Sequence, residues 1–124
     1  MRQHATRLSV LLAALFLLTT TILLWQSAFG SGIARRDAVH SAEQHRQKAV
    51  KLAQEAVDHS RQGRGDAFLT SAEAALQSAM KAGKSEQVDA AIAELTRAVE
   101  QGNAGHEDLA RTNVEQAVRH LSEK

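Results

Sequence analysis

The sequence predicts an all-α protein, an antiparallel up-down-up-down four-helix bundle preceded by an N-terminal hydrophobic segment. Its 124 residues include no proline, they are rich in alanine and other good helix formers, and glycines separate segments with helical spacing of apolar residues. The chain also lacks cysteine, which excludes disulfides, thiolate metal ligands and a thiol nucleophile. Any bound metal would therefore be held by imidazole and oxygen.

The first thirty residues have the pattern of an export signal. Basic residues precede an uncharged run from Leu8 to Trp25, and the small residues of SAFGSG follow it. Cleavage after Gly30 suits the small-residue rule, whereas the length of the run also suits a retained membrane anchor. We predict a signal peptide over 1–30 and a periplasmic protein, with attachment to the inner membrane as the alternative if the segment is not cut.

Residues 31–36 form a predicted linker, and residues 37–124 form the predicted bundle. Arg2 and Arg7 leave with the signal, so the 15 basic and 14 acidic residues become 13 and 14, for a net charge of −1. A mixed, weakly acidic surface has no basic stripe for nucleic acid and no polybasic membrane patch. We expect no nucleic-acid partner, and membrane contact only through an uncleaved N-terminal segment.

The first helical hairpin is predicted over residues 37–62 and 66–82, with the turn at Gly63–Gly65. Both segments carry narrow apolar stripes at helical spacing, although Arg46 interrupts the first. The two stripes are Val39, Ala42, Val50, Ala53 and Val57, and then Phe68, Leu69, Ala72, Ala75, Leu76 and Ala79.

The second hairpin follows the connection Ala82–Lys84 and is predicted over residues 86–102 and 107–122. Because all the connections are short, neighbouring helices are expected to run antiparallel and to bury their apolar stripes in one core. The stripes of this hairpin are Val88, Ala91, Ile92, Leu95 and Val99, and then Leu109, Ala110, Val114, Ala117, Val118 and Leu121.

The two hairpins are similar in sequence at an offset of 42 residues, which aligns Gly63 with Gly105 and Asp66 with Asp108. A glycine ends a helix in the left-handed conformation, and we expect the Asp three residues later to cap the next helix. The residues of the first hairpin that recur in the second are Ala49, Ala56, Val57, Gly63, Asp66, Thr70, Glu73 and Ala75.

The stretches AVKLAQEAVDHSRQG, AGHEDLA and VEQAVRHL resemble the small metal-binding protein family of periplasmic four-helix bundles. The resemblance runs from about residue 40 to the C-terminus and includes the export signal. Family members are rich in histidine, at seven-residue spacing and just after the turn glycine, and are associated with copper and other divalent metals. The resemblance implies weak binding of copper, nickel or zinc, with copper first, for metal buffering or tolerance.

Most histidines of the family pattern are replaced in this chain. Other residues occupy these positions at Leu52, Arg64, Ser71, Ser78, Glu94, Gln101 and Asn113. The resemblance therefore implies a histidine-depleted member, with ligands at the positions where histidine remains, which are His45, His59, His106 and His120.

Spacing limits how these histidines cooperate. His45 and His59 would lie roughly 21 Å apart on one helix, too far to share an ion. A chelate within one helix needs residues three or four apart, as Glu55 and His59 are. Two further combinations are His120 with Glu123, and His106 with Glu107 and Asp108. The predicted metal ligands are His59, His106, His45, His120, Glu55 and Asp108.

Each histidine also has an ordinary structural explanation. His59 suits the last turn of a helix, His106 suits a turn, and His45 and His120 flank the apolar seam. The alternative function is therefore a periplasmic helical interaction or stress protein that kept the scaffold without its metals and has an unknown protein partner.

Catalytic patterns are absent from the sequence. It contains no Gly-x-Ser-x-Gly elbow, no glycine-rich phosphate loop, no Cys-x-x-Cys-His haem motif and no Glu-x-x-His di-iron motif. We therefore expect no enzyme activity.

Overall fold

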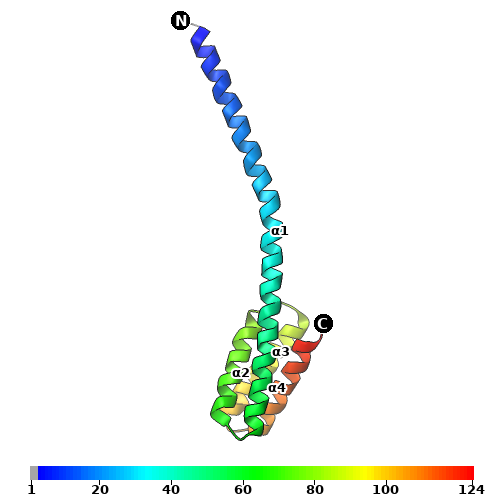
Figure 1. Cartoon of the computed structure of the whole chain (residues 1–124). Coiled ribbons are helices and arrows are strands. Elements are labelled where there is room, and N and C mark those ends of the chain that lie inside the picture. The colour runs from blue at the N-terminus through cyan, green and yellow to red at the C-terminus, as the bar shows by residue number, and fades with distance from the viewer. Residues whose placement is uncertain (1–2) are drawn as a thin grey trace. The chain divides into compact units, whose positions relative to one another are not determined.

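A computed structural model describes the backbone of residues 3–124 and the side chains of residues 32–124. Over the described backbone the chain has four helices and no strand (Figure 1). The all-α prediction is therefore confirmed. The helices are α1 (Gln3–Arg61), α2 (Gly65–Met80), α3 (Glu86–Asn103) and α4 (Glu107–Ser122).

The first helix begins far earlier than the predicted start at residue 37. α1 is continuous through residues 31–36, where the sequence suggested a linker. This segment has no proline, and Gly32 weakens a helix without removing a hydrogen-bond donor. Residues 31–36 therefore continue the helix and do not interrupt it.

The side chains of the predicted export signal over 1–30 lie outside those that the structure describes. Over residues 32–124 no helix is both long and apolar enough to cross a membrane. The chain divides into two compact units, one ending at Ala38 and the other spanning Val39–Lys124. The second unit contains the histidines of interest.

Within Val39–Lys124 the four helices lie alongside one another, with α2 packed on α3 and α3 on α4 (Figure 1). The bounds of α2, α3 and α4 agree closely with those predicted from the sequence. α3 has a side-chain cap, because the Oγ of Ser85 accepts a hydrogen bond from the Val88 N–H at 3.2 Å.

The turn between α1 and α2 closes as the sequence predicted, through a left-handed glycine. Gly63 has φ 69°, and its N–H donates to the carbonyl of Ser60 at 3.0 Å. The N–H of Arg64 donates to the carbonyl of His59 at 2.9 Å. These two bonds form a Schellman motif, which satisfies the last carbonyls of α1.

The predicted capping by aspartate is wrong. The N-cap positions of α2 and α4 are Arg64 and His106, and neither side chain makes a capping hydrogen bond. Asp66 and Asp108 lie inside the first turns instead, because each helix begins two residues earlier than a capping Asp would need. There the two carboxylates can still interact favourably with the helix dipoles.

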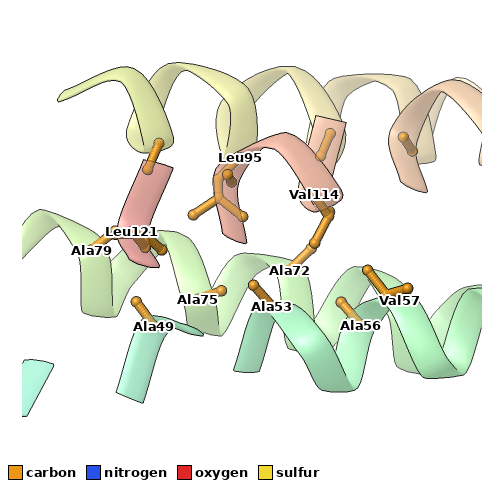
Figure 2. Close-up of a cluster of buried hydrophobic side chains, with 14 of the residues drawn as sticks. Ala49, Ala53, Ala56, Val57, Ala72, Ala75, Ala79, Leu95, Val114 and Leu121 are labelled. Atoms are coloured by element: carbon orange, nitrogen blue, oxygen red, sulfur yellow. The ribbon is translucent and has the colours of Figure 1, made fainter. Parts of the chain in front are cut away.

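The core of Val39–Lys124 is made largely of alanine, and its large residues alternate between the hairpins. Each of the four largest fully buried side chains has alanine at the equivalent position of the other hairpin. Figure 2 shows Leu95, Val114 and Leu121 among alanines of α1 and α2. The exchanged pairs are Ala53 and Leu95, Phe68 and Ala110, Ala72 and Val114, and Ala79 and Leu121.

Two predicted core residues are on the surface. Val39 is 66% exposed and Leu109 is 58% exposed, although both fit the apolar spacing. Val39 is the first residue of its compact unit, and Leu109 lies in the first turn of α4. At these ends a stripe has fewer facing side chains to cover it.

Candidate metal centre

His59 lies in the last turn of α1, where its carbonyl anchors the glycine turn. The side chain is half-buried, and its Nδ1 is enclosed without a hydrogen-bond partner. A metal ion could therefore reach this ring only through Nε2. Glu55, half-buried one turn earlier on α1, supplies the carboxylate at the spacing a helical chelate needs.

His106 is exposed and occupies the N-cap of α4. Its N–H donates to the carbonyl of Gln101 at 2.8 Å, and Gly105, with φ 81°, donates to Gly102 at 3.1 Å. This is the same Schellman motif as in the first turn, with His106 in the position of Arg64.

The acids next to His106 have other neighbours. Asp108 forms an ion pair with Arg111, and its Oδ1 accepts a hydrogen bond from Nη2 of that arginine at 2.9 Å. The carboxylate of Glu107 lies against α2, since a Cβ added to Gly65 would be 2.9 Å from its Oε1. A metal at His106 would have to compete with Arg111 for Asp108.

The equivalence of the two turns explains why neither turn histidine recurs in the other hairpin. His59 aligns with Gln101, and His106 aligns with Arg64. The two histidines therefore occupy different positions of one turn type. The close approach of Gly65 and Glu107 places both turns at the same end of the bundle (Figure 1).

His45 and His120 belong to the remainder of the bundle. His45 is half-buried on α1, next to Arg46, which pairs with Glu43. His120 is half-buried near the end of α4 and lines a pocket with residues of α3. The helix spacing separates His45 from His59, so these two cannot share an ion.

Over residues 32–124 no three histidine, aspartate or glutamate side chains already converge in a way that would hold a metal ion. Of the ligands that the sequence predicted, Glu55 with His59 and His106 with Asp108 are instead neighbouring pairs at the ends of helices. Two-ligand sites of one imidazole and one carboxylate can bind borderline divalent metals, but weakly.

The structure thus defines the class of protein. It is a small helical protein whose imidazole and carboxylate groups lie on its surface and not in a closed cleft. A family model described as "Small metal-binding protein" matches residues 9–124, which is most of the chain. The chain therefore belongs to the small metal-binding protein family. Comparison with curated proteins found no match.

Proposed function

We propose that this protein binds divalent metal ions weakly and reversibly, with copper preferred over nickel and zinc, to buffer them or to confer tolerance. The match to the metal-binding family over residues 9–124 carries this proposal. Copper(II) is placed first because imidazole suits it and because it leads the divalent series in affinity. Weak binding follows from donors that are paired and not yet convergent.

We propose His59, His106, His45 and His120 as imidazole ligands, with Glu55 and Asp108 as the carboxylates. Glu55 is the better placed of the two acids, because Asp108 already pairs with Arg111. Binding at Asp108 would release that arginine, whereas binding at Glu55 breaks no ion pair within residues 32–124.

The proposal includes export to the periplasm and a signal peptide over 1–30. It is supported by the uncharged run from Leu8 to Trp25. Mass spectrometry of the protein from fractionated cells tests it. A chain beginning at Ser31 in the periplasm is expected, whereas an intact chain in the membrane fraction would favour the anchor.

We also propose the antiparallel up-down-up-down arrangement of two similar hairpins. Arg46, early in the bundle part of α1, contacts the carbonyl of Glu123 after α4, and Arg61 at the end of α1 pairs with Glu115 earlier in α4 at 3.3 Å. Gly102, near the end of α3, approaches Phe68 near the start of α2. Both sets of contacts support opposed helix directions.

The alternative is a helical interaction or stress protein without a metal function. The absence of a converged ligand group over residues 32–124 favours it, as do the exposed apolar side chains of Val39, Met80 and Leu109. Such a protein would be indifferent to metal and would form a defined complex.

Calorimetric titration with Cu²⁺ tests the metal proposal. The untagged protein should be used as the expressing cell processes it, near neutral pH, with thermal melts of the same samples. Metal binding is expected to raise the melting temperature, because an ion bound only by the folded state stabilises it. Affinity no better than that of free imidazole would reject the proposal.

Variants then test the ligands. His59→Ala combined with His106→Ala is expected to weaken copper binding, whereas His40→Ala serves as the matched control on an exposed residue of α1. Unchanged affinity in the double variant would show that the assignment of these two ligands is wrong even if copper binds.

A further inference from the structure

A pocket of about 230 Å³ lies where the start of α3 meets the end of α4. Glu86, Gln87 and Ala90 of α3 form one wall, and His120 of α4 with Glu123 just after it forms the other. The two helices pack directly against each other (Figure 1). The pocket therefore joins the pair His120 and Glu123 to donors from a second helix.

The two carboxylates of this pocket make no ion pair within residues 32–124, unlike four other acids of the bundle. Within residues 32–124, Glu43, Glu94, Asp108 and Glu115 pair with arginines. The side chains of Glu86, Glu123 and His120 make neither an ion pair nor a hydrogen bond in that part of the chain. A cation entering the pocket would displace no arginine.

Backbone contacts hold the residues that carry these side chains. The N–H of Glu123 donates to the carbonyl of Arg119 at 3.1 Å, and its own carbonyl accepts from Arg46 at 3.0 Å. Glu86 begins α3 immediately after the capping Ser85. The C-terminal end of α4 also carries a partial negative charge, which favours a nearby cation.

We propose that Glu86, His120 and Glu123 form an interhelical site for a borderline divalent ion such as Zn²⁺. This inference rests on the proposed metal-binding function and adds the second helix to it. One imidazole and two carboxylates are ligands that zinc accepts in four-coordinate sites, and the amide oxygen of Gln87 or water completes the set.

The side chains must rotate to form this site, since no three such groups converge over residues 32–124. Glu86 and Glu123 are exposed, and no ion pair within residues 32–124 opposes the rotation of their side chains. Ala90 is small and leaves room beside His120. The site is therefore assembled by the ion, and its affinity is lower than that of a preformed site.

The decisive variant is Glu86→Gln, because Glu86 lies on the other helix from the histidine. Zn²⁺ titration of the full chain is monitored by calorimetry and by the NMR signals of the His120 ring. Glu86→Gln is expected to weaken zinc binding about tenfold or more, as loss of a ligand should cost at least as much as loss of an outer-shell partner. Glu73→Gln, an exposed glutamate of α2, is the control and should bind as the parent does.

Glu123→Gln provides a second variant if Glu86→Gln melts at a lower temperature in metal-free buffer. Zinc binding by the parent with unchanged affinity in both variants would overturn the interhelical site and leave the proposed function standing. Copper binding without zinc binding would overturn the choice of ion and with it this site. Failure of the parent to bind either metal would overturn both proposals.

Discussion

The guanidinium of Arg46 donates a hydrogen bond from Nη1 to the backbone carbonyl of Glu123, with a donor–acceptor distance of 3.0 Å. This contact joins α1 to the residue that follows α4. The Nε of Arg46 also lies 3.1 Å from the Oε2 of Glu43, one turn earlier. The arginine that interrupts the apolar stripe is thus 20% exposed, with its stem packed on the bundle and its charged end at the rim.

Replacement of Arg46 by Met is expected to lower the free energy of unfolding by about 1 kcal/mol, because the stem is kept while the donor to Glu123 is lost. Urea denaturation measures the change. Arg97→Met is the control, since Arg97 is 64% exposed and within residues 32–124 pairs only with Glu94 on its own helix, so its replacement should change little. Equal losses in the two variants would contradict a special role for Arg46.

The pKa of the Glu43 carboxyl should depend on the same arginine, Arg46. The hydrogen bond from Arg46, and then that from Gln47, hold the pKa of Glu43 below its ordinary value. Because the folded pKa is depressed, this contribution to stability is present above the ordinary glutamate pKa and is lost as the pH falls through the lowered value. Carboxyl ¹³C NMR should show the pKa of Glu43 rising in Arg46→Met, and an unchanged pKa would argue against the contact.

Ser60→Ala is expected to stabilise the protein by about 0.5–1 kcal/mol. The Ser60 Oγ is buried without a hydrogen-bond partner, and alanine removes this polar atom while favouring the helix. Thermal and urea unfolding would detect the gain. Ser122→Ala is the contrast, because its Oγ donates to the Val118 carbonyl at 2.7 Å at the surface. A loss of stability in Ser60→Ala would indicate that its hydroxyl has a partner in solution.

Gly102→Ala is expected to destabilise the protein by about 1–3 kcal/mol through overpacking. A Cβ at this position would lie 2.7 Å from Cδ2 of Leu69 and 3.1 Å from Cε1 of Phe68. Gly32→Ala is the matched control, because a Cβ there would meet nothing within 4 Å. A melting temperature of Gly102→Ala equal to that of Gly32→Ala would show that Leu69 and Phe68 move aside freely.

Leu95→Ala is expected to cost about 2–5 kcal/mol, because the surrounding core is mostly alanine and cannot fill the cavity (Figure 2). Leu109→Ala is the control on an exposed leucine of the same bundle and should cost less than about 0.5 kcal/mol. Similar losses in the two variants would contradict the burial pattern.

Much of the fold could be predicted because its signals are local. Gly63 and Gly105 end their helices in the expected left-handed conformation, and the apolar spacing located α2, α3 and α4. The start of α1 could not be predicted in this way, because nothing in residues 31–36 either forces or forbids a helix. Val39 and Leu109 were placed in the core wrongly, since periodicity does not show where a facing helix ends.

The candidate site was less predictable, because it depends on side chains far apart in the sequence. Spacing identified the pairs Glu55 with His59 and His120 with Glu123 as neighbours on or beside one helix. It did not find Glu86. In an antiparallel hairpin, however, residues equally far from the turn lie opposite each other, and residues 86 and 123 are equally far from the turn between α3 and α4. That register was the one signal that could have revealed the contribution of α3.

The sequence by itself determined the number of helices, the glycine turns and the family, since each depends on residues near one another in the chain. Only the tertiary structure decided which groups meet. It laid Glu107 against Gly65 and placed Glu86 in the pocket of His120. These contacts depend on how the helices pack, and alanine-rich stripes are too alike to specify that packing from sequence.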